Sequence, residues 1–335
     1  MTRAAFQYMY DAEGNTYLDM RNNIPHVGHC HPRVVIAGER QMARLNTNTR
    51  YLYDELTSFS EHLLSKFPDS LNRVFLVNSG SAAVDLAIRL ALDHTQKSKI
   101  AVLEHGYHGN TNTGIGISHY KYSGKGGQGK GKQVIQLSLP DVYRGKFNDP
   151  SSAGERYSRE AISIIDEAGP GLAALIAEPV VGCGGQVPLA EGYLRHMYTF
   201  IRQQGGVCIS DEVQTGFGRL GNFFWGFEMH NVTPDIVVLG KPMGNGHPLA
   251  AVVTTEDICS SFENRMEFFS SFGGNPVSCS IGQAVLQVIE DEKLQEKIFY
   301  YTSLRGIHYI RDQLFVFKEI LQIPAVLSGK YCRFP

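Results

Sequence analysis

Short runs of apolar and β-branched residues alternate along the chain with longer segments whose apolar residues recur at helical spacing. The segment 81–93 carries such an apolar stripe, formed by Val84, Leu86, Ala87, Leu90 and Ala91. The expected helices are Asp54–Lys66, Ser81–Asp93, Glu155–Glu167, Gly192–Gln204 and Val277–Ile298. The expected strands are Val74–Val77, Ile100–Leu103, Val134–Leu137, Ala173–Ala177, Val207–Ser210 and Ile236–Leu239. This alternation predicts an α/β fold in which right-handed crossovers build a mostly parallel sheet.

Polar residues follow four of the expected strands. The turn Ser79-Gly80-Ser81 comes after the first strand, and Glu178, Asp211 and Lys241 each come after a later one. The intervals from Glu178 to Asp211 and from Asp211 to Lys241 are each about 30 residues, roughly one strand–helix–strand unit. Ligands of such sheets lie beyond the carboxyl ends of the strands. We therefore expect these residues to meet at one edge of the sheet.

The turn Ser79-Gly80-Ser81 stands at the start of an expected helix. The first backbone N–H groups of a helix have no partner inside it, and together with the helix dipole they attract an anion. Gly80 would let a phosphate approach the backbone closely. The alternative is that Ser79 or Ser81 only caps the helix.

Lys241 lies between Gly240 and Pro242, directly after an apolar strand. Partial burial there would lower the pKa of its amine and make it nucleophilic, as Schiff-base chemistry requires. Asp211, after a neighbouring strand, would suit a buried cation. An anion-binding turn, such a lysine and an aspartate for a pyridinium nitrogen are what pyridoxal phosphate needs. The alternative is a structural ion pair of Lys241 with Asp211 or Glu212.

Three further segments partly match known functional motifs. Residues 124–130 have the glycine spacing of a phosphate-binding loop, but Gly131 replaces the Ser or Thr that magnesium needs and no strand leads in, so we expect a flexible basic loop. The histidines of residues 26–31 have no second ligand pair at zinc-like spacing, which favours a packed or pocket-lining turn. Residues 216–219 lack the full dinucleotide-binding pattern, and turn glycines explain them.

Composition narrows the classes of protein that remain. The chain has 335 residues, a formal net charge of −2, 43% hydrophobic and 19% charged residues, so neither wholesale disorder nor a nucleic-acid partner is expected. No apolar run approaches the roughly 20 residues of a membrane-spanning helix, and the first residues lack the apolar core of a signal peptide. The 6 cysteines include no C-x-x-C pair. We expect a cytoplasmic protein with no membrane partner.

A series of motifs resembles the class III aminotransferases, pyridoxal-phosphate enzymes of fold type I. In order they are YDAEGNTYLDM, GHCHP, VNSGS, GYHG, AEPVVG, ISDEVQTGFGR, VLGKPMGNGHP and FGGNP, from about Tyr8 to about Glu290. The resemblance implies a mostly parallel central sheet with helices on both faces, plus a small α+β domain. Residues 1–45 would belong to the small domain and 46–295 would form the large cofactor-binding domain. Residues 296–335 would be a remnant of the small C-terminal domain, with an atypical tail that looks truncated.

The resemblance also implies roles for the residues after the strands. Lys241 would hold pyridoxal 5'-phosphate covalently and would move the α-proton of the substrate. Asp211 would pair with the ring nitrogen of the cofactor. Ser79, Gly80 and Ser81 would bind the phosphate of the cofactor.

The same resemblance places further residues around the cofactor ring. Tyr107 and Val213 would pack on its two faces, and Gln214 would lie near its 3-oxygen. Glu178 and His108 would lie beside the ring.

Ser271 is the one site residue that the resemblance assigns to a partner subunit. It would reach the cofactor phosphate of that subunit, which implies a homodimer with shared active sites. Family members usually carry Thr at this position, and Ser keeps the hydroxyl. They also usually carry Glu where this chain has Ala82.

Within the family, the stretches LNTNTRYL, LPDVYRG, CGGQ and GKPMGNGHP resemble the phospho-lyases of ethanolamine phosphate or phosphohydroxylysine. The implied enzyme takes a small primary amine and eliminates phosphate, giving an aldehyde, ammonia and phosphate. Its pocket must hold a second phosphate, and the basic residues considered for that group are Lys121, Lys125, Lys130, His26 and Arg144. Two alternatives stay open: an ω-amine:keto-acid transaminase, and an inactive fragment that binds pyridoxal phosphate.

Overall fold

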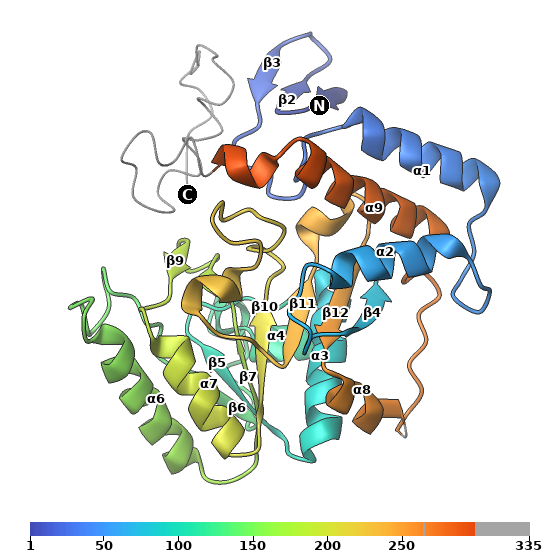
Figure 1. Ribbon diagram of the computed structural model, residues 1–335. Coiled ribbons are helices and arrows are strands. Elements are labelled where there is room, and N and C mark those ends of the chain that lie inside the picture. The colour runs from blue at the N-terminus through green and yellow to red at the C-terminus, as the bar shows by residue number, and fades with distance from the viewer. Residues whose placement is uncertain (264, 299–335) are drawn as a thin grey trace.

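A seven-stranded sheet forms the centre of the structure (Figure 1). The computed structural model describes residues 1–263 and 265–298. Across the sheet the strand order is β4 (Arg73–Val77), β12 (Ala250–Thr254), β11 (Ile236–Leu239), β10 (Val207–Asp211), β7 (Leu172–Ala177), β5 (Lys99–Leu103) and β6 (Val134–Leu137). β12 runs antiparallel to both of its neighbours, and the remaining pairs are parallel. The expected mostly parallel sheet is confirmed.

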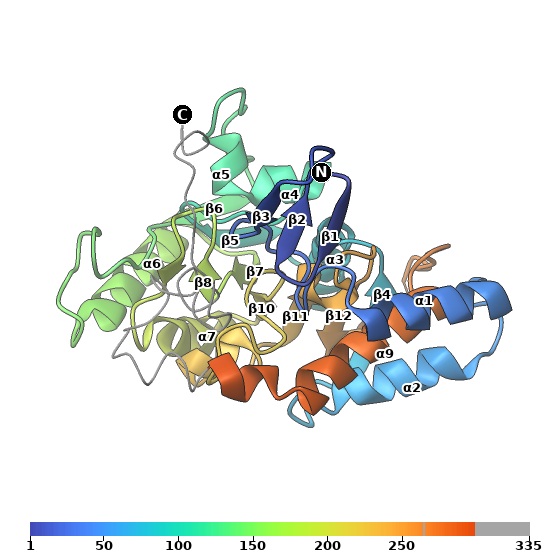
Figure 2. The same cartoon turned by 90° about the horizontal axis from the view of Figure 1, so that it is seen from above.

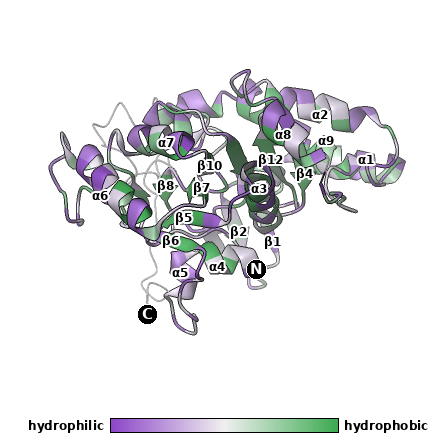
Figure 3. Ribbon diagram, turned by 90° about the horizontal axis from the view of Figure 1, so that it is seen from below, coloured by the Kyte–Doolittle hydropathy of each residue, from purple (hydrophilic) through white to green (hydrophobic). Residues whose placement is uncertain are grey.

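Helices cover both faces of this sheet, as the resemblance implied. They are α2 (Asp54–Leu64), α3 (Gly80–Thr95), α6 (Ala153–Ala168), α7 (Tyr193–Gln203), α8 (Glu256–Glu263) and α9 (Pro276–Asp291). α3 and α8 share one apolar core with the sheet, and α2, α6, α7 and α9 pack in two cores on the other face. Successive strand residues point to opposite faces, so Val237 packs near α9 while Val238 packs near α3. Figure 3 shows hydrophobic and hydrophilic sides on α6 and α7.

The N-terminal segment covers the edge at which the parallel strands end. It contains a small antiparallel sheet of β1 (Arg3–Ala5), β2 (Tyr8–Tyr10) and β3 (Thr16–Leu18), followed by α1 (Pro32–Arg44), which packs against α9. Asn23 Nδ2 donates to Gln214 Oε1 at 3.0 Å, and the backbone N–H of Val27 donates to Asn245 Oδ1 at 2.9 Å. Both bonds join this segment to loops that follow sheet strands. Figures 1 and 2 show the small sheet above that edge.

Short elements fill the loops that follow β5, β7, β10 and β11. They are α4 (Asn112–Ile117), α5 (His119–Tyr122), β8 (Val180–Val181), β9 (Val187–Pro188) and the 3-10 helices Gly226–His230 and Lys241–Gly244. Lys241 is the first residue of the second of these 3-10 helices.

Most expected elements appear within one or two residues of their predicted bounds. The prediction of one continuous helix over Val277–Ile298 is wrong. α9 ends at Asp291, and Lys293 adopts a left-handed φ of 51° before residues 294–298 become helical again. β12, the small sheet, α1, α4, α5 and α8 were not expected. Residues 299–335, which hold most of the expected C-terminal remnant, lie outside the described residues, and the domain boundaries stay predictions. No helix among the described residues is long and apolar enough to cross a membrane.

Candidate active site

The turns after β4, β10 and β11 touch one another. A Cβ atom on Gly240 would lie 3.2 Å from Val213 Cγ1 and 3.3 Å from Gly80 Cα. A Cβ atom on Gly80 would lie 3.0 Å from Val213 Cγ2. The absence of side chains on both glycines therefore lets the turn before α3 approach the backbone beside Lys241. The structure brings together residues that the sequence placed at separate strand ends.

The turn before α3 presents open hydrogen-bond donors. Ser79 Oγ accepts from the backbone N–H of Ala82 at 3.2 Å, so Ser79 caps the helix, as in the simpler of its two sequence interpretations. The N–H groups of Gly80 and Ser81 have no acceptor among the described residues. Two free donors at the positive end of a 16-residue helix suit a phosphate group.

The loop after β5 is fastened to the same turn. Ser81 Oγ accepts from the backbone N–H of Asn110 at 3.0 Å. Gly109 has a φ of +113°, and a Cβ atom there would lie 3.0 Å from Ser81 Cα, so a side chain is excluded by both conformation and space. Thr111 Oγ1 donates to Asp85 Oδ1 at 2.9 Å. These contacts fix the position of Tyr107 and His108, which precede them in the loop.

Lys241 is half-buried at the start of the 3-10 helix that follows β11. Its amine forms no hydrogen bond and no ion pair within residues 1–263 and 265–298. The ion pair with Asp211 or Glu212, kept open from the sequence, is therefore not formed in the structure. The amine is available to a ligand.

Asp211 pairs with a histidine and not with the lysine of the alternative interpretation. Its side chain is buried, and its Oδ2 lies 2.8 Å from Nδ1 of the equally buried His108. Asp211 Oδ1 accepts from the backbone N–H of Val213 at 3.2 Å. A carboxylate at this distance holds the proton of His108 on Nδ1 and fixes the orientation of the ring. The backbone N–H of His108 donates to Ser118 Oγ at 2.7 Å, which anchors the pair from behind.

Glu212, the next residue, is buried on the opposite side of β10. Its carboxylate accepts from Ser210 Oγ, Thr215 Oγ1 and the backbone N–H groups of Gly226 and Phe227, at 2.5 to 3.0 Å. Burial raises the pKa of Glu212, and these hydrogen bonds oppose the rise. The carboxylate thus ties the loop between residues 213 and 227 to the end of β10.

Glu178 bridges two loops beside this pair. Its Oε1 accepts from the backbone N–H of Tyr107 at 3.0 Å, and its Oε2 accepts from the backbone N–H of Gly182 at 3.1 Å. Burial, and next the negative charge of Asp211, raise the pKa of Glu178 to about 7. Glu178 therefore changes its charge near neutral pH.

The remaining ring-lining candidates lie around this centre. Val213 packs on Gly80 and Gly240, and Gln214 approaches Gly182, where a Cβ atom would lie 3.7 Å from Gln214 Cγ. Tyr107 is half-buried, next to His108. Their roles toward the cofactor stay predictions.

Ser271 is not brought to this cluster. It is exposed, and its neighbour Phe272 is 70% exposed. The turn is held elsewhere, because Gly273 packs on the carbonyl of Leu76 so closely that a Cβ atom would lie 2.1 Å from the oxygen. The expected contact with a partner subunit stays a prediction.

His26, one of the basic residues considered for a second phosphate, is excluded from that role. Its Nε2 lies 2.8 Å from the carbonyl oxygen of Phe217, and its Nδ1 lies 3.4 Å from Arg219 Nη2. Burial, and next the charge of Arg219, lower the pKa of His26 to about 3, so the ring is neutral. The segment is the packed turn that its sequence favoured.

Several residues of the site were missed in the sequence. Asn23 reaches Gln214 from the N-terminal segment, Ser118 holds the backbone of His108, and Asn110 binds Ser81. Cys183 lies exposed in the glycine-rich turn after Glu178. That turn, Gly182-Cys183-Gly184-Gly185, was the available signal for a close backbone approach. The other contacts join residues too far apart in sequence for a local pattern.

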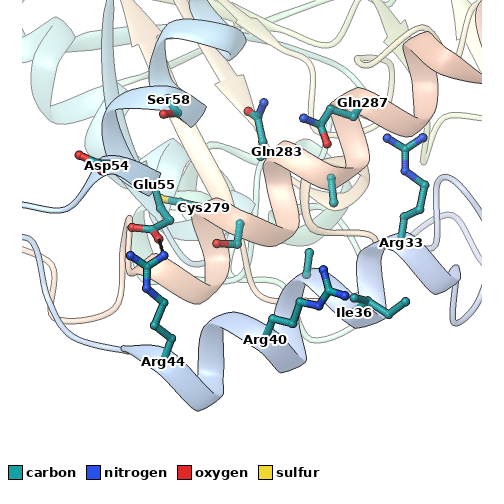
Figure 4. Close-up of a pocket in the computed structure, with 13 residues that line it drawn as sticks. Arg33, Ile36, Arg40, Arg44, Asp54, Glu55, Ser58, Cys279, Gln283 and Gln287 are labelled. Atoms are coloured by element: carbon teal, nitrogen blue, oxygen red, sulfur yellow. Dashed lines mark hydrogen bonds and ion pairs between the residues drawn. The ribbon is translucent and has the colours of Figure 1, made fainter.

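A pocket of about 620 Å³ lies elsewhere, between α1, α2 and α9 (Figure 4). Its lining includes Arg33, Arg40 and Arg44, and Arg44 Nη1 pairs with Glu55 Oε1 at 3.2 Å. None of the predicted site residues lines it. The candidate active site is therefore the cluster of loops at the strand ends.

Comparisons with known proteins identify the family to which the chain is similar. The aminotransferase class-III family model matches residues 1–304. The chain is 48% identical over 305 residues to "Alanine--glyoxylate aminotransferase 2-like" of Drosophila melanogaster, covering 89% of this chain and 62% of that protein. It is 40% identical over 311 residues to "Ethanolamine-phosphate phospho-lyase homolog 1" of Caenorhabditis elegans, covering 88% and 66%. The chain thus spans somewhat less than two thirds of the length of these curated relatives.

Solved structures share the fold. A phospholyase from Arthrobacter in complex with phosphoethanolamine superposes with a TM-score of 0.84 at 39% identity, over 91% of this chain and 72% of that chain. A PLP-bound amine transaminase from an uncultivated Pseudomonas species gives a TM-score of 0.84 at 26% identity, over 90% and 73%. The free N–H groups of Gly80 and Ser81, the unpartnered amine of Lys241 and the buried carboxylate of Asp211 fit the phosphate, the aldehyde and the ring nitrogen of this cofactor.

Replacing Glu212 tests its role as an anchor. In Glu212→Gln, an amide NH2 group faces donors that the carboxylate oxygens accepted, so at least one buried donor loses its partner. We expect the free energy of unfolding to fall by about 2–4 kcal/mol in urea titrations. The control is Glu256→Gln, whose exposed side chain pairs with Arg73, with an expected change within about 0.5 kcal/mol. Equal effects of the two substitutions would contradict the role.

The raised pKa of Glu178 predicts a pH-dependent stability of the cofactor-free protein. The unfolded chain ionises this carboxyl near its ordinary pKa, and the folded protein does so near 7, so ionisation disfavours folding between about pH 5 and 8. Over that range, wild type should lose about 1–3 kcal/mol of unfolding free energy relative to Glu178→Gln. Parallel stability curves for the two proteins would show that the pKa is not raised.

Proposed function

The chain belongs to the class-III aminotransferase family and uses pyridoxal 5'-phosphate, and we propose that it eliminates phosphate from a small phosphorylated primary amine. The observation that carries the amine chemistry is the unpartnered amine of Lys241 beside the open donors of Gly80 and Ser81. The choice of a phospho-lyase is supported by 40% identity to a relative named as an ethanolamine-phosphate phospho-lyase homolog and 39% to a phospholyase. Ethanolamine phosphate is the model substrate.

Lys241 would hold the cofactor and exchange a proton with the substrate. Bound pyridoxal phosphate supplies an electron-withdrawing ring that stabilises negative charge on the carbon beside the substrate nitrogen. The N–H groups of Gly80 and Ser81 fix the cofactor phosphate. The Lys241 amine then stands at the turn that touches Gly80, where it removes the proton from that carbon.

Asp211 would hold the ring nitrogen of the cofactor. His108 donates to Asp211 Oδ2 and orients the carboxylate, while Oδ1 accepts from the backbone N–H of Val213. Tyr107 and Val213 would exclude water from the cofactor ring. Glu178 lies to one side.

The leaving group separates this reaction from transamination. After the substrate loses its proton, the bond from the neighbouring carbon to the phosphate oxygen breaks, and its electron pair leaves with the phosphate. Water then hydrolyses the carbon–nitrogen bond of the remaining two-carbon product, which releases an aldehyde and ammonia. With ethanolamine phosphate the balance is one water consumed and one acetaldehyde, one ammonia and one phosphate formed.

The second candidate is an ω-amine:keto-acid transaminase. It is favoured by 48% identity to a relative named as an alanine–glyoxylate aminotransferase 2-like protein. That reaction uses the same lysine and aspartate, but the proton returns to the cofactor and the nitrogen passes to a keto acid. The third candidate, left open from the sequence, is a cofactor-binding chain without turnover.

A homodimer with shared sites completes the proposal. Large apolar side chains are exposed in two adjoining segments, namely Tyr51 and Leu52 in one and Met266, Phe269 and Phe272 in the other. Arg50 lies over the ring of Phe269, 4.5 Å from its centroid, which joins these segments. Exposed apolar patches of this kind favour association, and Ser271 lies within the patch. A cytoplasmic location remains the expectation from the sequence.

Product analysis separates the candidates. Holoenzyme is incubated with ethanolamine phosphate, and in parallel with an unphosphorylated amine and a keto acid. We expect phosphate and ammonia to appear in equal amounts without a keto acid. Amino transfer without phosphate release would identify the transaminase, and neither reaction in a cofactor-loaded protein would identify the inactive form.

Lys241→Ala tests the attachment of the cofactor. Borohydride reduction of the wild-type holoprotein should fix the cofactor mass on the peptide that contains residue 241, and turnover should fall by a factor of at least about 1,000 in the variant. The matched control is Lys132→Ala, which replaces an exposed lysine. This variant should keep the covalent labelling at residue 241 and the turnover of wild type. Recovery of the cofactor on another lysine of wild type would overturn the assignment.

A further inference from the structure

We propose that Lys121 binds the phosphate group of the substrate, forming an anion subsite on the side of the active site lined by Tyr107 and Tyr120. This inference rests on the proposed function, because it names the residue that would distinguish a phosphorylated amine from an ordinary one. The observations that carry it are the position of Lys121, its missing counter-charge and the exclusion of the other basic residues.

The position of Lys121 is fixed by the loop that carries His108. Helix α5 is tied to that loop twice: the backbone N–H of Tyr120 donates to the carbonyl of Gly106 at 3.2 Å, and the backbone N–H of His105 donates to His119 Nδ1 at 3.0 Å. The rings of Tyr107 and Tyr120 meet edge to face, with centroids 6.2 Å apart. Lys121 Nζ lies 5.6 Å from the first centroid and 5.9 Å from the second.

Lys121 and Lys241 both act on one neighbour, the thiol of Cys183. Burial and Glu178 raise the pKa of the Cys183 thiol, while the charges of Lys241 and Lys121 both act to lower it. The printed contacts give the same connection: Lys121 Nζ lies 5.6 Å from the centroid of the Tyr107 ring, the backbone N–H of Tyr107 donates to Glu178, and Glu178 holds the turn of Cys183 through Gly182. A small amine bound at Lys241 can place a phosphate toward Lys121.

The charge of Lys121 is not neutralised by the protein. The side chain is half-buried, and among the described residues its amine has no carboxylate or other hydrogen-bond partner. Nearby carboxylates are engaged elsewhere: Glu178 with two backbone N–H groups, Asp211 with His108. A partly desolvated cation without a partner gains most from an incoming dianion, and lysine binds phosphate as a point charge.

The other basic residues considered from the sequence do not meet these conditions. Lys125 and Lys130 are exposed in the loop beyond α5, with no contact to the site. Arg144 reaches the glycine-rich turn, where a Cβ atom on Gly185 would lie 3.3 Å from its Nη2, but its side chain is largely exposed and its Nε lies 3.5 Å from Asp141 Oδ2. His26 is neutral and occupied, as described above. The structure reduces the candidates in the sequence to Lys121.

A charge at Lys121 would favour phosphorylated amines at the step at which phosphate elimination separates from transamination. When the carbon–oxygen bond breaks, its electron pair adds negative charge to the departing phosphate, and a nearby ammonium group stabilises that charge. An unphosphorylated amine places no anion there. Removing the charge of Lys121 should therefore weaken the binding of ligands that carry a phosphate and leave the binding of unphosphorylated amines unchanged.

The test uses three variants of the holoenzyme: Lys121→Met, Lys121→Arg and the matched control Lys125→Met. Calorimetry measures the Kd of inorganic phosphate and of ethanolamine phosphate, and assays give KM and kcat for phosphate release. Lys121→Met should weaken both ligands at least 10-fold and raise KM by a similar factor. The Kd and KM values of Lys121→Arg should stay within about 3-fold of those of wild type, and the values of Lys125→Met should equal those of wild type. In all three variants the visible absorbance of the bound cofactor should be normal.

Ligand binding and phosphate release are measured separately, so a failure of the proposed function can be told from a failure of the anion subsite. If wild type binds ethanolamine phosphate without releasing phosphate, the proposed function fails, and a weaker Kd in Lys121→Met alone still supports the subsite. If Lys121→Met and Lys125→Met bind both ligands as wild type does, or wild type binds neither, the subsite is overturned. If Lys121→Met does not fold, Lys121→Gln replaces it under the same criteria.

Discussion

Two consecutive carboxylates, Asp211 and Glu212, are buried at the end of β10, and the rest of the site depends on how each is stabilised. Removing an ionised carboxylate from water is costly unless hydrogen bonds replace the water. Because successive residues of a strand point to opposite sides, the two carboxylates meet different partners. Glu212 takes four donors and becomes an anchor for the loop up to Phe227. Asp211 takes His108 and one backbone N–H and keeps capacity for a ligand.

This division also explains why the lysine stays available. If Asp211 had no histidine partner, the nearest cation would compete for its charge. With Asp211 satisfied by His108 and Glu178 held by two backbone N–H groups, the amine of Lys241 has no carboxylate to bind among residues 1–263 and 265–298. An amine without a carboxylate partner is available to react with a carbonyl group. The close packing of Gly80, Gly240 and Val213 then brings that amine to the phosphate turn.

The sequence predicted the parts of the site that depend on local rules. A strand followed by a polar residue places that residue at the carboxyl edge of a parallel sheet, and this rule located Asp211, Glu178 and Lys241 correctly. The sequence could not supply the pairing of Asp211 with His108, since 103 residues separate them and no periodicity links them. β12 was missed because an alternation of strands and helices predicts only parallel neighbours, whereas β12 returns antiparallel between β4 and β11. The interpretation of His26 as a phosphate ligand failed because burial keeps its ring neutral.

The central claim is that Asp211, held in place by His108, would keep a proton on the ring nitrogen of the cofactor. The most direct test is ¹⁵N NMR of the protein loaded with pyridoxal phosphate labelled at that nitrogen. The account predicts a protonated-nitrogen chemical shift in wild type across about pH 6 to 9, and an unprotonated one in Asp211→Asn. An unprotonated ring nitrogen in wild type at neutral pH would contradict the account.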